Sequence, residues 1–148
     1  MGAVRAKWVR CPELWLFACL SACALISGAR FEDDSYGHYA RSLLQIQGAD
    51  YTTWITDVWN RPLPGLVYGL GSYAGLGGAR VCAAGLALGA AHLTARVTER
   101  ILPADVRPSR AMLLLGYFSQ PAVLRDSFVT MTELPAAFFV AASLFFLI

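Results

Sequence analysis

The chain has 148 residues, of which 57% are hydrophobic and 15% are charged, and its mean hydropathy is +0.51. This composition is much more apolar than that of an average soluble domain, so it argues against a water-soluble globular protein. A net charge of +2 without any Lys/Arg block argues against nucleic acid as a partner. The uncharged runs do not alternate as strands do, so we expect an all-α integral membrane protein with about four transmembrane helices.

The first apolar run covers about 13–29 and follows the basic residues Arg5, Lys7 and Arg10. Its small-residue end at 27–29 has the pattern of a cleavage site, so a removable export signal is one interpretation. Because further apolar runs follow, we favour an uncleaved membrane helix. The positive-inside rule then predicts a cytoplasmic N-terminus.

Three consecutive acids, Glu32, Asp33 and Asp34, come directly after this run. Apolar residues then recur at three- and four-residue spacing from Tyr36 to Leu44, which predicts an amphipathic helix along the membrane surface with its N-cap at Asp34 or the next residue. The acids could simply cap that helix and stay in water. Alternatively, one of them is a positioned base, because a lipid-borne substrate presents its head group at this depth.

The next apolar run, 62–79, contains two prolines and six glycines, which is a poor composition for an uninterrupted helix. We therefore expect a half-embedded helix that completes an outer loop over 30–79. Arg61 directly precedes this run. Its guanidinium suits phosphate oxygens, but snorkelling to the interface beside Trp54 and Trp59 is an equally simple interpretation.

Three further helices are expected at about 80–97, 110–121 and 135–148. The basic residues around the first two predict a second cytoplasmic stretch: Arg96, Arg100, Arg107 and Arg110. An even number of crossings must separate this stretch from the basic N-terminus. Either the run 62–79 does not cross, which we favour, or 80–95 is re-entrant.

This topology brings the loop 30–79 and the segment 122–134 to the outer side. Glu133 stands just ahead of Pro135, where an acid can serve only as a dipole partner for the first turn of a helix. The sequence stops inside an apolar run with no polar anchor, so we expect the chain to be a fragment of a longer protein.

Within the expected helix 80–97, Gly85 and Gly89 form a small-xxx-small pair suited to helix packing. We expect His92 to be a packed polar residue. The four cysteines have no metal-ligand spacing, and no nucleotide-binding loop or nucleophile motif is present.

Five short motifs occur in order along the chain: Asp33-Asp34-Ser35-Tyr36, Gly48-Ala49-Asp50, Arg61-Pro62-Leu63, Gly77-Gly78-Ala79-Arg80 and Thr132-Glu133-Leu134-Pro135. Together they resemble the N-terminal part of the polytopic GT-C glycosyltransferases, especially the protein O-mannosyltransferases and the lipid A aminoarabinose transferases. In that family an acidic pair follows the first membrane helix, and a small-residue turn with Ala-Arg opens the helix after the Pro element.

The resemblance implies transfer of a sugar from a polyprenyl-phosphate donor to a lipid, glycan or protein acceptor at the outer membrane face. Asp33 would be the base, Asp34 would support it, Arg61 would bind the donor phosphate, and Glu133 would be the second-loop acid. The resemblance implies no definite cofactor and allows a divalent cation. It also implies a multi-pass protein, in contact with membrane lipids, in the plasma (inner) membrane of a bacterium.

Family members are several hundred residues long, so we expect this chain to be inactive by itself. Two other classes of protein remain open. A transporter fragment would favour ionisable groups in the middle of helices, where only Arg80 and His92 come close. A small non-catalytic membrane subunit is favoured by the short length.

Overall fold

The structure is a computed structural model that describes residues 11–26, 33–48, 62–127, 129–130 and 132–148. Every regular element in these ranges is a helix, which confirms the all-α prediction. The helices are α2 (Pro12–Ile26), α3 (Asp33–Ile46), α5 (Pro62–Ser72), α6 (Gly75–Ile101), α7 (Arg110–Phe118), α8 (Pro121–Asp126) and α9 (Glu133–Leu147).

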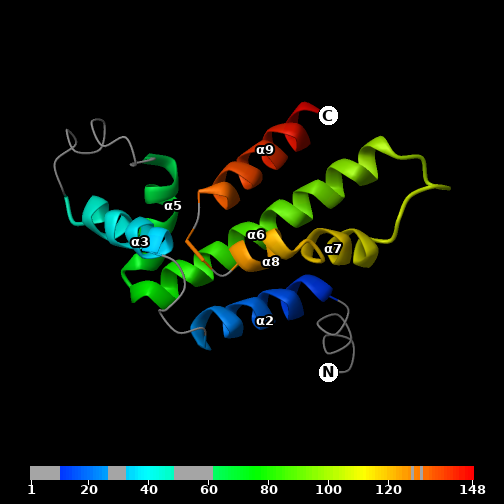
Figure 1. Cartoon of the computed structure of the whole chain (residues 1–148). Coiled ribbons are helices and arrows are strands. Elements are labelled where there is room, and N and C mark those ends of the chain that lie inside the picture. The colour runs from blue at the N-terminus through cyan, green and yellow to red at the C-terminus, as the bar shows by residue number, and fades with distance from the viewer. Residues whose placement is uncertain (1–10, 27–32, 49–61, 128, 131) are drawn as a thin grey trace, which may run out of the picture.

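The longest helix, α6, lies at the centre of the molecule and contacts α2, α5, α7 and α9 (Figure 1). The helices beside it alternate in direction. Figure 1 shows α2 and α7 running one way along the molecule, and α6 and α9 running the other way. The N-terminal ends of α2 and α7 therefore lie at the same end of the molecule as the C-terminal ends of α6 and α9.

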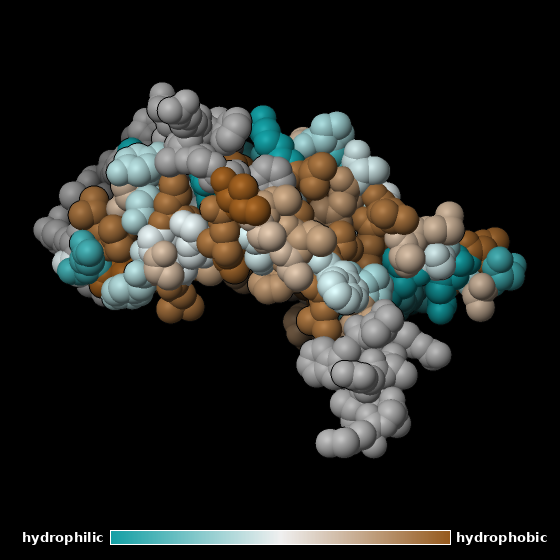
Figure 2. Space-filling model, turned by 90° about the horizontal axis from the view of Figure 1, so that it is seen from below, coloured by the Kyte–Doolittle hydropathy of each residue, from teal (hydrophilic) through white to brown (hydrophobic). Residues whose placement is uncertain are grey.

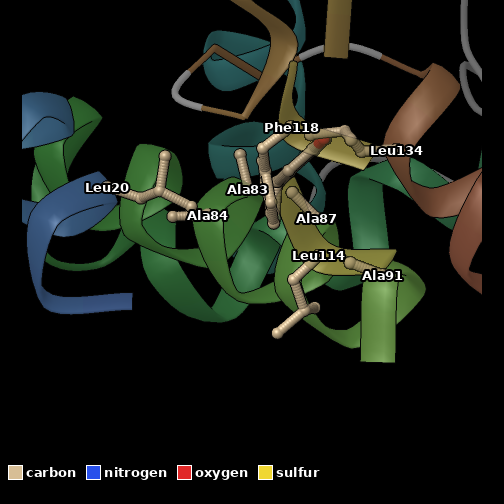
Figure 3. Close-up of a cluster of buried hydrophobic side chains, with 9 residues drawn as sticks. Leu20, Ala83, Ala84, Ala87, Ala91, Leu114, Phe118 and Leu134 are labelled. Atoms are coloured by element: carbon tan, nitrogen blue, oxygen red, sulfur yellow. The ribbon is translucent and has the colours of Figure 1, made fainter. Parts of the chain in front are cut away.

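The core forms around a row of alanines on α6, because small side chains allow neighbouring helices to approach closely. The buried alanines are Ala79, Ala83, Ala84, Ala87, Ala90, Ala91 and Ala95. Figure 3 shows Leu20 of α2, Leu114 and Phe118 of α7, and Leu134 of α9 gathered around four of them. Larger side chains on the outer helices thus fill the space that the alanines leave.

The two glycines predicted to form a packing pair face different helices. A methyl group at Gly85 would lie 3.7 Å from the Phe17 ring of α2, whereas one at Gly89 would lie 2.7 Å from the Phe138 ring of α9. The first distance is an ordinary contact and the second is a clash. Only Gly89 is therefore required for close packing.

One turn separates α5 from α6, so the helix expected over 62–79 is divided. Gly75 adopts a φ of 78°, which residues with a side chain rarely adopt. A methyl group at Gly71 would lie 2.5 Å from the carbonyl oxygen of Gly78, so the two helices meet backbone to backbone. The helix expected over 80–97 accordingly begins earlier, at Gly75, and Arg80 is buried inside it instead of opening it.

A second break divides the helix expected over 110–121. Ser109 caps α7, since its hydroxyl accepts a hydrogen bond of 3.3 Å from the amide of Met112. The helix ends at Phe118, and Pro121 begins α8, because proline lacks the N–H needed to continue a helix but suits its first turn.

Among the described helices, α6 alone is long and apolar enough to cross a membrane. It has 27 residues, and 39% of its most apolar stretch is buried by the rest of the chain. Helices α2 and α9 are apolar but have 15 residues each, and α7 has nine. The structure therefore contains one candidate membrane span, and it does not confirm the expected four.

The outer helices expose large hydrophobic side chains, such as Trp15 of α2 (63% exposed), Leu115 of α7 (68%) and Phe146 of α9 (83%). Figure 2 shows a mainly hydrophobic surface over much of one face and a hydrophilic patch toward the end of the molecule where α6 ends. Exposed apolar area of this kind indicates contact with lipid or with other protein.

Candidate functional site

The acidic pair opens α3. Asp33 and Asp34 are the first two residues of this helix, which therefore begins one or two residues before the expected N-cap. Their side chains lie outside what the structure describes. Helix α3 contacts α5 and, less extensively, α6. The first turn of α3 lies toward the end of α6 at which Gly75 is found (Figure 1).

The contact between α3 and α5 depends on small residues. A methyl group at Gly65 would collide with the amide of Gln45, and one at Gly69 would lie 2.9 Å from Ile46. Ser42 of α3 is buried as well, and its hydroxyl donates a hydrogen bond of 2.7 Å to the carbonyl oxygen of His38. This packing fixes the orientation of α3, and with it the helix turn that contains the two aspartates.

Arg61 lies outside the described residues. It directly precedes Pro62, the first residue of α5, so its position in the sequence adjoins the helix on which α3 packs. Its contacts with phosphate or with the interface stay a prediction.

Glu133 is the first residue of α9 and its side chain is exposed. Its Oε2 accepts a hydrogen bond of 3.3 Å from the hydroxyl of Thr132, which is buried. Helix α9 contacts α5 in addition to α6. Helices α3 and α9, whose first turns contain the predicted acids, thus both contact α5.

The segment before Glu133 contains several buried polar groups. Asp126 is 8% exposed and accepts a hydrogen bond of 2.9 Å from Nε of Arg125. Ser127 is fully buried, and its hydroxyl donates a hydrogen bond of 2.6 Å to the carbonyl oxygen of Val123. Thr130 is fully buried too. The two hydrogen bonds are local to α8 and the residue after it, so they satisfy buried polar groups within the segment itself.

A cluster of ionisable residues that the sequence did not predict joins three helices at the other end of the molecule. The carboxylate of Glu13 in α2 forms an ion pair with Arg110 at the start of α7, with Oε1 and Nε 2.6 Å apart. The Nδ1 atom of His92 in α6 lies 3.9 Å from the same carboxylate oxygen and 2.5 Å from Nη2 of Arg110. The Glu13 side chain is 16% exposed, so this is a partly buried pair that ties α2, α6 and α7 together.

The only sequence signal for this cluster was an acid in an otherwise basic N-terminal stretch, together with a histidine one turn before Arg96 on α6. Neither signal identifies the partner, because Glu13 and Arg110 are far apart in the sequence. From the sequence, Arg110 was interpreted only as one of the basic residues that set the membrane topology.

The described residues contain no group of three or more His, Cys, Asp or Glu side chains that could hold a metal ion. The side chains of Asp33 and Asp34 are not among those described, so the possible divalent cation at the acidic pair stays a prediction.

Comparisons with protein-family models, with curated proteins and with solved structures find no match to this chain.

Proposed function

We propose that the chain contains the acidic catalytic residues of a membrane glycosyltransferase that takes its sugar from a polyprenyl-phosphate donor. The observation that supports this proposal is the shared contact of α3 and α9 with α5. The first turns of α3 and α9 contain Asp33, Asp34 and Glu133, and α5 begins directly after Arg61. The acids thus open two helices that contact α5, and Arg61 directly precedes α5 in the sequence.

The proposed reaction is a direct displacement. The Asp33 carboxylate accepts the proton of the acceptor hydroxyl or amine, and the freed electron pair forms the new bond to the anomeric carbon of the sugar. The bond between that carbon and the phosphate oxygen breaks, and polyprenyl phosphate leaves as the anion. Arg61 stabilises the developing negative charge on the phosphate, and Asp34 keeps Asp33 in position.

The alternation of helix directions supports the proposed topology. At about 1.5 Å per residue, α6 is about 40 Å long, which exceeds the hydrocarbon core of about 30 Å. The basic residues after α6 and the basic N-terminus lie on the cytoplasmic side in this proposal. The first turns of α3 and α9 then lie on the outer side of the plasma membrane, where lipid-linked sugars serve as donors.

The test uses membranes from bacteria that express the protein from its complete reading frame. Transfer is measured from radiolabelled polyprenyl-phosphate mannose and, separately, from the aminoarabinose donor. Asp33→Asn should lower the transfer rate by about 10²-fold or more, because a general base contributes rate factors of this order. Asp105→Asn is the matched control, since Asp105 is an exposed acid in the loop between α6 and α7.

Unchanged transfer by Asp33→Asn would remove this residue from the mechanism. No transfer from either donor by the wild-type protein would favour the small non-catalytic subunit instead.

A further inference from the structure

A cavity of about 420 Å³ opens where the C-terminal ends of α6 and α9 meet. Its walls are formed by Arg96, Glu99 and Arg100 of α6, Arg107 of the following loop, and Phe145 of α9. Ligand sites in proteins have volumes of about 300–1,000 Å³, so this cavity is large enough to hold a head group.

The cavity is positively charged, because three arginines face one glutamate. Arg96 pairs with Glu99 at 3.0 Å. Arg100 and Arg107 instead donate hydrogen bonds to backbone carbonyls, of Phe145 at 2.7 Å and Leu102 at 3.0 Å respectively. Within the described part of the chain, neither of these two arginines forms an ion pair with a carboxylate.

Both arginines retain donors for a ligand. A guanidinium has five N–H groups, and the contacts above use one from each side chain. The guanidinium carbon of Arg100 lies 4.0 Å from the centre of the Phe145 ring, so the ring supports one face of the planar group. This support restricts the motion of Arg100 and leaves the edge of its guanidinium for hydrogen bonds.

The cavity lies at the depth of lipid head groups if α6 crosses a membrane. Arg96 is about 31 Å along the helix from Gly75, at about 1.5 Å per residue, which matches the thickness of the hydrocarbon core. The part of α9 that runs back from the cavity exposes apolar side chains: Phe139, Val140 and Leu144. A basic cavity thus adjoins an apolar surface, which is the arrangement that an amphiphilic anion requires.

We propose that this cavity binds the phosphate group of an anionic phospholipid. Arg100 and Arg107 donate to the phosphate oxygens, since a guanidinium fork matches their geometry. The acyl chains extend along α9. Basic pockets between membrane helices on the cytoplasmic side are typical sites for anionic head groups. This inference does not depend on sugar transfer, because it concerns the opposite end of the molecule.

The experiment measures lipid binding to the purified full chain in a neutral detergent by native mass spectrometry. The probes are phosphatidylglycerol, phosphatidylcholine with the same acyl chains, and inorganic phosphate. We expect phosphatidylglycerol to bind about ten-fold or more tightly than phosphatidylcholine, since each interfacial arginine contributes a substantial electrostatic attraction. The double variant R100Q/R107Q should lose this preference.

The matched control is R41Q/R125Q, which removes the same two charges from α3 and α8. It should keep the preference for phosphatidylglycerol. Glu99→Gln should increase that preference, because it frees Arg96 from its carboxylate partner. This third variant tests the site by a gain of binding, so it remains informative if the double arginine variant fails to fold.

Three results would overturn the proposal. Equal binding of the two lipids would show that the cavity does not select an anion. An equal loss in both double variants would show that only net charge matters. Binding of inorganic phosphate as tightly as the lipid would identify a free-anion site.

Discussion

The two ends of the helix bundle are held together by different kinds of contact. One end is defined by Arg96, Arg100, Arg107 and Arg110 and is called the arginine end. The other is defined by Gly65, Gly69, Gly71 and Gly78 and is called the glycine end. At the arginine end, Arg110 of α7 pairs with Glu13 of α2, and Arg100 of α6 donates a hydrogen bond to Phe145 of α9. At the glycine end, α3, α5 and α6 approach so closely that a single methyl group would clash.

This difference separates two kinds of sensitivity. Charged contacts weaken with salt and with loss of a partner, but they tolerate changes of volume. Backbone-to-backbone contacts tolerate salt but not added atoms, because neither helix can move away without separating from the others. Substitutions at the two ends should therefore differ in how much they lower the free energy of unfolding. They should also differ in how strongly that loss depends on ionic strength.

The largest effect is expected at the glycine end, for Gly71→Val. The added side chain would meet the backbone of Gly78 and the sulfur of Cys82, at 2.5 and 2.6 Å from its first carbon. We expect the free energy of unfolding in detergent to fall by about 3 kcal/mol, the upper range for overpacking. Gly116→Val on α7 is the control, since nothing lies within 4 Å of a methyl group there. Equal losses in the two variants would attribute the effect to helix propensity.

The second effect is expected at the arginine end, for Glu13→Gln. The substitution preserves shape but leaves Arg110 and His92 without their shared carboxylate. Loss of one partner of a partly buried ion pair costs about 2 kcal/mol, between the values for exposed and for buried pairs. Denaturant titrations at low and high salt would measure it, and the difference from wild type should shrink at high salt. A salt-independent loss would contradict the electrostatic interpretation.

A smaller effect is expected for Ser109→Ala, which removes the hydroxyl that caps α7. Loss of an N-cap costs about 1 kcal/mol of stability. Ser143→Ala is the control because the Ser143 hydroxyl is exposed and bonds only to the carbonyl oxygen four residues earlier in α9. The two variants should be ranked by thermal unfolding, and identical midpoints would argue against a capping role.

The smallest effect is expected for Glu99→Gln. Its ion pair with Arg96 is an i,i+3 pair whose arginine side chain is 49% exposed. Such pairs contribute about 0.5 kcal/mol or less. The unfolding midpoint should therefore change little while lipid binding increases. A large loss of stability would mean that the cavity depends on this glutamate for its shape.

The helices themselves were predictable because their causes are local. Uncharged apolar runs define α2, α6 and α9, and the spacing of apolar residues from Tyr36 defines α3. The break before α8 was missed, although its cause, Pro121, is local too. The start of α6 was misplaced because its true cause is the close contact of Gly71 with Gly78, and a glycine-rich composition does not reveal which glycines meet.

The candidate site was predictable only in part. The sequence identified Asp33, Asp34 and Glu133 as residues near helix starts, and these positions do open α3 and α9. It could not identify the Glu13–Arg110 pair or the contact of Arg100 with Phe145, which are separated by long stretches of chain. Such contacts depend on how the helices pack, and packing is not encoded in any one segment.

The hydrogen bonds of Arg100 and Arg107 also affect how two helices end. The last carbonyl groups of a helix have no partner within it, and they concentrate the negative end of the helix dipole. Arg107 donates to Leu102, the C-cap of α6, and Arg100 donates to Phe145 in the last turn of α9. Each arginine therefore supplies a partner for a carbonyl group at an exposed helix end. Lysine at these positions would keep the charge. It would lack the planar guanidinium, whose N–H groups can donate to the helix end and to a second acceptor at the same time.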